Sequence, residues 1–184
     1  SDFYNTFRNY EKAIEKQLKA VSVAIKLKNV NLYCTSMDGL AMLYADSKQV
    51  EKAINLFEKF IEWEKGNLPT GDERLVNTLL HYGLYLSELK LCDDAESKYL
   101  EMINIVNSKT PKDSLRLREI YHDLSLMQAQ CSNSEAGNKK AIEYCLIAAD
   151  ISLRHQGLSS TNYLMDLSLL SSLNPGKKDA MKYN

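Results

Sequence analysis

The fold is decided by the segment Val50-Glu51-Lys52-Ala53-Ile54-Asn55-Leu56-Phe57. From Val50 onward, apolar residues recur at i, i+3, i+4, i+7, i+10 and i+11, which places them on one face of an amphipathic helix. A second segment of the same design follows, Cys92-Asp93-Asp94-Ala95-Glu96-Ser97-Lys98-Tyr99. In both segments an alanine is followed four residues later by an aromatic residue. The pattern predicts two helices that occupy equivalent places in a repeated structure.

The rest of the chain also has helical patterning. Further helices are predicted over 75–91, 95–106, 115–130, 139–153 and 161–173, where apolar residues recur with helical spacing. No stretch shows the sustained alternation of apolar and polar residues that is typical of a half-buried strand. Only 7 glycines and 3 prolines are present among 184 residues, too few for the many turns of an all-β protein. An all-α fold is therefore expected.

Small residues upstream extend the repeat. Twelve residues before each of the two alanines lies a small residue, Ala41 or Gly83, with a large apolar residue four positions earlier. A third copy pairs Ser125 with Ala141, once the turn Ser132–Asn138 is given about four extra residues. The equivalent alanines are then Ala13, Ala53, Ala95, Ala141 and Ala180, at intervals of 40, 42, 46 and 39 residues.

This arrangement resembles the tetratricopeptide repeat (TPR), in which helix A has a small residue at repeat position 8 and helix B has one at position 20. The resemblance implies an all-α, right-handed superhelical solenoid of antiparallel helix pairs, in a long-period variant of about 40–42 residues. Each copy is degenerate, because Gln17, Cys145 and Asn184 replace the aromatic residue of position 24. An irregular helix bundle is the alternative.

The repeat phase suggests boundaries. One repeat domain is expected over 1–184, with repeats at about 1–29 (partial), 30–65, 72–107, 113–155 and 160–184 (partial). Both ends fall inside a repeat, so we expect a segment of a longer chain. Solenoid ends without capping helices expose apolar surface, which predicts weak self-association.

Composition excludes several classes of partner. The 23 basic and 24 acidic residues leave a net charge of −1, so no nucleic-acid binding by this segment is expected. The longest apolar run has about five residues, so no membrane insertion is expected. The four cysteines form no CxxC pair and are predicted to be reduced and packed, in a cytoplasmic chain, or a periplasmic one if it belongs to a membrane sensor.

Signals for chemistry are weak. The three histidines lack metal-ligand spacing, and no phosphate loop or nucleophile motif occurs, so no enzyme activity, cofactor or metal is expected. Asp93-Asp94 is interpreted as a helix N-cap, and Trp63 as packing between repeats. The interspersed charges from Glu62 to Lys65 are interpreted as a solvated helix face.

The TPR resemblance implies a concave face lined by helix A. Position 9 is apolar in each copy (Met42, Leu84, Leu126), and acidic residues lie beside it. The predicted partner-binding groove comprises Asp38, Met42, Asn77, Leu80, His81, Leu84, Glu88, Glu119, His122 and Leu126. Such a face suits an amphipathic helix with basic flanks, from another protein or from the same chain. The alternative is that position 9 simply packs against a neighbouring helix.

Two functions remain open after this reading. The first is a protein- or peptide-binding scaffold module. The second is a ligand-sensing regulatory repeat domain of a bacterial sensor or transcription regulator. The composition of the predicted groove does not separate them.

Overall fold

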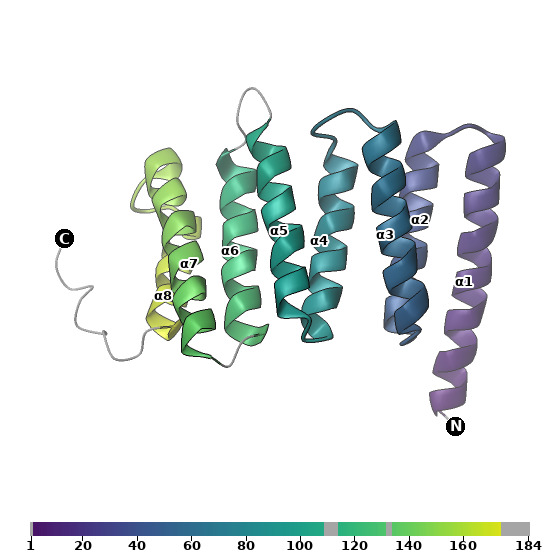
Figure 1. Cartoon of the computed structure of the whole chain (residues 1–184), viewed down its shortest axis with the longest axis horizontal. Helices are drawn as coiled ribbons and strands as arrows, with labels where there is room; N and C mark the ends of the chain where they lie inside the picture. Colours follow the sequence, from purple (N-terminus) through teal and green to yellow (C-terminus); the bar gives the residue numbers. More distant parts are fainter. Residues whose placement is uncertain (1, 109–113, 132–133, 174–184) are drawn as a thin grey trace. The chain divides into compact units, whose positions relative to one another are not determined.

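All regular elements of the chain are α-helices (Figure 1). The computed structural model describes residues 2–108, 114–131 and 134–173, and no strand occurs in these ranges. The helices are α1 (Asp2–Lys26), α2 (Val30–Asp46), α3 (Val50–Asn67), α4 (Glu73–Glu88), α5 (Cys92–Asn107), α6 (Ser114–Cys131), α7 (Glu135–Gln156) and α8 (Thr161–Leu173). The predicted all-α fold class is confirmed. Ala180 and Asn184, which the repeat register includes, lie outside the described residues.

The chain divides inside α4 into two compact units, Ser1–Tyr82 and Gly83–Asn184. In unit 1, α1 packs against α2 and α2 against α3. In unit 2, α5 packs against α6, α6 against α7, and α7 against α8. Helices that follow each other in the chain therefore pair, as expected for antiparallel helix pairs.

The predicted repeat register is visible in the core. Ala53, Ala95 and Ala141 are fully buried, with exposed fractions of 0%. The Ser125 hydroxyl on α6 donates a hydrogen bond to the Ala141 carbonyl on α7 at 2.7 Å, which joins positions 8 and 20 of one repeat directly. Gly83 is equally informative, because a Cβ added there would lie 3.1 Å from the buried Tyr99 ring. A side chain at this position would therefore require the Tyr99 ring to shift, so glycine suits the close approach of α4 and α5.

The turns between paired helices also repeat. Lys48 after α2 and Lys90 after α4 both have positive φ, at 61° and 62°. At each turn the following N–H reaches back to a carbonyl five residues earlier, from Gln49 to Tyr44 and from Leu91 to Leu86. This is the Schellman geometry that ends many helices. The same turn therefore forms in equivalent places 42 residues apart.

Two local predictions about helix starts are wrong. The N-cap of α5 is Leu91, without a side-chain hydrogen bond, and Asp93 and Asp94 lie inside the first helical turn. Their charges still favour the positive end of the helix dipole. The expected long turn before α7 is shorter, since Ser134 is the N-cap and its hydroxyl accepts from the Gly137 N–H at 3.0 Å. Helix α7 therefore begins at Glu135.

The prediction that all four cysteines are reduced is also wrong. Cys92 and Cys131 form a disulfide, while Cys34 and Cys145 are free and buried. Cys92 begins α5 and Cys131 ends α6, so pairing of these two helices brings the cysteines to a Cα–Cα distance of 5.7 Å. A spacing of 39 residues gave no hint of this pairing because it depends on where the helices end.

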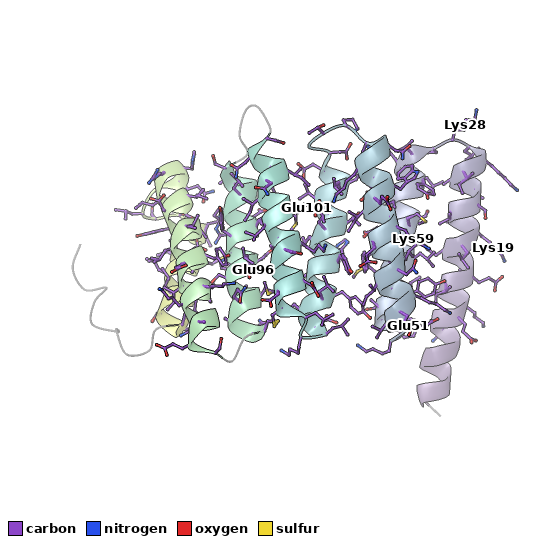
Figure 2. All side chains as sticks on the ribbon, in the orientation of Figure 1. Lys19, Lys28, Glu51, Lys59, Glu96 and Glu101 are labelled. Atoms are coloured by element: carbon purple, nitrogen blue, oxygen red, sulfur yellow. A yellow bond between two sulfur atoms is a disulfide. The ribbon has the colours of Figure 1, made fainter. Side chains whose placement is uncertain are left out.

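The surface carries many charged residues and a part of the apolar residues. Glu51 and Lys59 on α3, and Lys19 on α1, are exposed (Figure 2). Leu18 on α1 and Leu164 on α8 are exposed, whereas Leu170 on α8 is buried with Cys145 and Ala149. Within the described ranges, no helix combines the length and the hydropathy needed to cross a membrane.

Candidate functional site

The ten predicted groove residues are all accessible. In unit 1 they lie on α2 and the first part of α4, and in unit 2 on the end of α4 and on α6. None of them is buried, and four are exposed: Asn77, Leu84, Glu88 and Glu119. The Leu84 side chain has an exposed fraction of 46%, so it is not a core residue. Binding by these residues stays a prediction, and each unit is described separately below.

In unit 1, two predicted residues form an ion pair. His81 Nδ1 on α4 lies 2.9 Å from Asp38 Oδ2 and 3.0 Å from Oδ1 on α2. Asp38 raises the pKa of His81 by accepting this hydrogen bond, and burial of the ring opposes the rise. The pair therefore carries a compensated charge when His81 is protonated.

Beside this pair lies a cavity of about 120 Å³, which we call the acidic cavity. It is lined by Cys34, Thr35, Asp38, Glu64, Arg74, Asn77 and Thr78. Thr35, Asp38 and Asn77 occupy helix-A positions that the TPR resemblance assigns to the concave face. The cavity thus belongs to the predicted binding face of unit 1.

Glu64 is the unexpected residue of the acidic cavity. The sequence places it among surface charges, but its exposed fraction is 0%, so that interpretation is wrong for Glu64. Neither carboxylate oxygen has a hydrogen-bond partner among the described residues. The nearby Thr78 hydroxyl donates its proton to the Arg74 carbonyl at 3.1 Å. Burial raises the pKa of Glu64 to about 7, with Thr78 opposing the rise.

The other charges at this cavity are paired. The Arg74 guanidinium donates to Asp72 from Nε at 2.8 Å and from Nη2 at 2.6 Å. Its Nη1 donates to Asn31 Oδ1 at 2.6 Å. Asp72 also accepts the Arg74 backbone N–H at 3.0 Å, so its side chain caps the start of α4. The guanidinium of Arg74 therefore donates to Asp72 and Asn31 and not to Glu64.

In unit 2, a wider cavity of about 350 Å³ opens on α6 and α8, which we call the apolar cavity. It is lined by His122, Leu126, Met165, Ser168, Leu169 and Ser172. Leu126 belongs to the predicted apolar row, and Leu169 occupies the equivalent position 9, 43 residues later, on α8, so two position-9 residues share one cavity. Met165 contributes a side chain with an exposed fraction of 48%.

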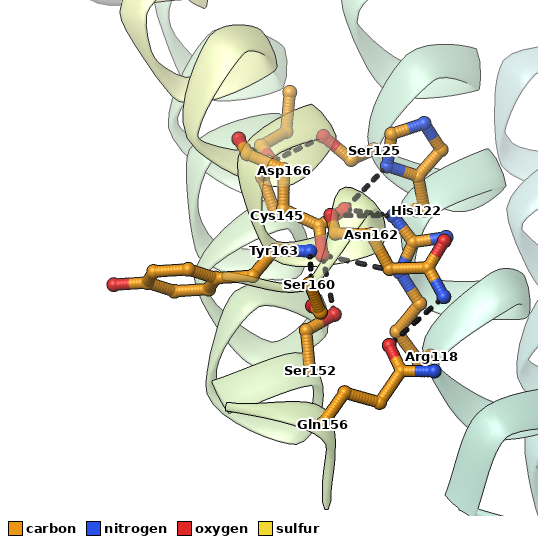
Figure 3. Close-up of polar contacts among 11 residues, drawn as sticks. Arg118, His122, Ser125, Cys145, Ser152, Gln156, Ser160, Asn162, Tyr163 and Asp166 are labelled. Atoms are coloured by element: carbon orange, nitrogen blue, oxygen red, sulfur yellow. Dashed lines mark hydrogen bonds and ion pairs between the residues drawn. The ribbon is translucent and has the colours of Figure 1, made fainter. Parts of the chain in front are cut away.

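Behind the apolar cavity lies a buried polar network centred on Asp166 (Figure 3). Arg118 donates to Asp166 from Nη2 at 2.5 Å and from Nε at 3.1 Å. His122 Nδ1 lies 2.7 Å from the same carboxylate, and the Ser152 hydroxyl donates to it at 2.8 Å. Asp166 and Ser152 are fully buried and Arg118 is 5% exposed. This network joins α6, α7 and α8 from within.

Neither region has the ligand set of a metal centre among the described residues. Among the described residues, no group of three or more His, Cys, Asp or Glu side chains could hold a metal ion. His81 and His122 each face a carboxylate in their own unit, rather than a shared ligand. Trp63 packs with its ring centroid 4.6 Å from that of Tyr33, in agreement with the predicted packing role.

In this chain, antiparallel helices pair at small residues, such as Ser125 and Ala141, that recur in a regular register. This arrangement is a TPR-like helical repeat. Solved structures of that fold are similar to this chain over nearly its whole length. BtubC (BKLC) from P. vanneervenii matches with a TM-score of 0.71 at 17% identity, covering 94% of this chain and 68% of that one. A putative kinesin light chain from Podosopora anserina, with nearly identical TPR-like repeats, matches with a TM-score of 0.71 at 15% identity, covering 97% and 85%. No family model and no curated protein matches the chain. The chain therefore has the TPR-like fold.

Sequence analysis missed Glu64 and Asp166. For Glu64 a signal was present, because it lies three and seven residues after Ile61 and Phe57 on the apolar face of α3. A carboxylate on that face has to be buried. The partners of Asp166, Arg118 and Ser152, come from two other helices, so the local sequence pattern does not predict the burial of Asp166.

Proposed function

We propose that this chain is a protein- or peptide-binding scaffold module whose helix-A faces take up an amphipathic helical segment. The helix-A face of each unit consists of the predicted groove residues that the unit contains. The apolar cavity carries the proposal, because two predicted position-9 leucines, Leu126 and Leu169, line one cavity of about 350 Å³. That volume falls within the usual range of ligand pockets and accepts a large apolar side chain.

The affinity would come from apolar side chains of the partner. Full burial of a leucine- or phenylalanine-sized side chain contributes roughly 1.5–3 kcal/mol. Met165 and Leu84, both about half exposed, supply apolar surface that a partner would cover. Methionine adapts its shape to different side chains, as at many promiscuous binding surfaces.

The partner's polar face would carry basic residues. Asp38 lies on the helix-A face of unit 1, and Glu88 and Glu119 lie on that of unit 2. Charge complementarity of this kind speeds the encounter and makes it sensitive to salt. The acids therefore favour a segment with flanking lysines and arginines.

A display library of amphipathic helical peptides with basic polar faces tests this proposal. We expect selected peptides to bind the wild-type chain, with dissociation constants measured by fluorescence anisotropy. Leu84→Asp and Met165→Asp should each weaken binding at least tenfold, while thermal melts stay near that of the wild type because both side chains are already exposed. Leu146→Asp is the matched control, since Leu146 on α7 is 53% exposed but belongs to a helix B. Equal effects of all three variants, or a library without binders, would contradict the proposal.

The ligand-sensing alternative is favoured by one observation, the acidic cavity of unit 1. Its volume of about 120 Å³ suits a small group better than a bulky side chain. A thermal-shift screen of small metabolites separates the two functions. Strong stabilisation by a metabolite, together with a peptide library that yields no binder, would favour the regulatory role.

A further inference from the structure

We propose that the acidic cavity of unit 1 is a binding site for a primary alkylammonium group. In the proposed scaffold this group is a lysine side chain of the docked segment, and that assignment rests on the proposed function. The site itself follows from the residues of the cavity.

The Glu64 carboxylate is buried without a hydrogen-bond partner in the described part of the chain. A buried carboxylate without hydrogen-bond partners is costly, because it has lost its hydration and gained nothing in exchange. Both Glu64 oxygens are buried and unpartnered among the described residues, and the side chain lines the acidic cavity. Donors from a ligand in this cavity would satisfy these oxygens.

The charges around the acidic cavity favour a cationic ligand. Asp72 is compensated by Arg74, and Asp38 shares a hydrogen bond with His81. Burial raises the pKa of the Cys34 thiol to about 11, so Cys34 adds no charge at neutral pH. Glu64 is left as the acid that lacks a counter-ion contact. A cationic ligand therefore fits the cavity, and an anionic one does not.

The acceptors that line the acidic cavity suit a primary ammonium better than a metal ion. A metal ion is not supported, because the described residues offer no group of three ligating side chains. A primary ammonium has three N–H donors on a compact head. The Glu64 and Asp38 carboxylates and the Thr35 hydroxyl, all lining the cavity, are the kinds of acceptor such a head requires. A volume of about 120 Å³ holds several waters, or an ammonium with the first carbons of its alkyl stem.

The position of the cavity connects it to partner binding. Thr35 and Asp38 on α2 and Asn77 on α4 occupy helix-A positions of the predicted concave face. A lysine has a flexible four-carbon stem that can carry its ammonium into a recess from a helix lying outside it. The basic flanks expected of the partner thus find a specific acceptor.

The experiment uses n-butylammonium chloride as the probe on the 184-residue chain at pH 8, where both the probe and Glu64 are charged. Binding is followed by NMR chemical-shift changes at Thr35, Glu64 and Thr78. We expect saturable binding, at least tenfold weaker in Glu64→Gln, and unchanged in Glu62→Gln, an exposed glutamate on the same helix. n-Butanol has the same stem without the charge, and should not bind. Butylammonium shifts that are not saturable, or equal for both variants, overturn the site.

A second arm distinguishes the lysine from a free amine. Each lysine of a selected binding peptide is replaced by norleucine, which keeps the stem and removes the ammonium. One replacement should weaken binding at least tenfold to the wild type and have no effect on Glu64→Gln. Butylammonium binding without any such lysine overturns the lysine assignment and leaves the cavity as a free-amine site. Peptide binding without butylammonium binding overturns the cavity and leaves the proposed function standing.

Discussion

Among the described residues, one carboxylate in each unit is completely buried, and the two have opposite surroundings. In unit 2, Asp166 is 0% exposed and is contacted by Arg118, His122 and Ser152. In unit 1, Glu64 is 0% exposed and has no hydrogen-bond partner among the described residues. A buried charge is tolerated only when something compensates it. Side chains of the protein compensate the charge of Asp166, whereas no described side chain forms a hydrogen bond with the Glu64 carboxylate.

The comparison separates a structural role from a binding role. The Asp166 network lies among three helices and leaves no polar group of Asp166 for a ligand. Glu64 lies against a cavity whose other residues come from α2 and α4. The same residue chemistry thus serves to hold unit 2 together and to recognise a ligand in unit 1.

The largest expected effect is the loss of the charge in unit 2. Asp166→Asn keeps the size of the side chain but leaves Arg118 buried without its counter-charge, which should cost about 3–5 kcal/mol of stability. Urea unfolding at pH 7 measures this cost. Glu64→Gln is the matched substitution in unit 1, and it should be neutral or stabilising because it removes an uncompensated charge. Equal destabilisation by both variants would erase the distinction between the two carboxylates.

Reduction of the disulfide should have the next largest effect on stability. The Cys92–Cys131 bond closes a loop of 39 residues in unit 2, and a loop of this length corresponds to about 3–4 kcal/mol of stabilisation in the chain-entropy description. Dithiothreitol or Cys131→Ser should lower the stability of unit 2 accordingly, measured by amide hydrogen exchange. Exchange from residues 30–67 of unit 1 is the internal control and should change little. A uniform loss of protection across both units would contradict this assignment.

A smaller effect is expected from the ionisation of Glu64. Burial raises its pKa from 4.5 to about 7, so the folded state holds the proton more tightly than the unfolded state does. Stability is then fully retained below about pH 4.5 and falls as the pH rises to about 7, by up to about 3 kcal/mol. Glu64→Gln should abolish this fall. We therefore expect the two proteins to diverge in urea midpoint between pH 5 and 8 in favour of the variant.

The smallest effect concerns the ion pair beside the acidic cavity. Asp38 raises the pKa of His81, so the pair stabilises the folded state at low pH and loses this contribution as the pH rises through the folded-state pKa of His81. Asp38→Asn should lower that pKa, as measured by NMR titration of the imidazole, with a stability change below about 1 kcal/mol. An unchanged His81 titration would show that the pair does not form in solution.

Much of the fold was predictable because small residues at helix crossings are a local signal. The register of Gly83 and the three buried alanines follows from their spacing, and the close contact of Gly83 with Tyr99 agrees with it. The helix ends were less predictable. Capping at Leu91 and Ser134 depends on turn geometry, which residue type alone does not determine.

The candidate site was predictable only where it follows the repeat. Accessible helix-A positions such as Leu84 and Asp38 come directly from the register. The disulfide, the Asp166 network and the burial of Glu64 depend on which side chains from distant helices meet. Those meetings are properties of packing between helices, and a single helical pattern contains no record of them.

The Glu64 carboxylate is a vacant acceptor for a cation in the acidic cavity. The most direct measurement is a pH titration of its carboxyl ¹³C resonance with and without saturating n-butylammonium. The groups facing Glu64 are Asp38 on α2, and Asp72, Arg74 and Thr78 on and before α4, so Asp38→Asn serves as a control for their influence. The account predicts an apparent pKa near 7 in the free chain that falls by at least one pH unit with the amine, since a bound cation favours the charged form. An unchanged titration in the presence of the amine would contradict it.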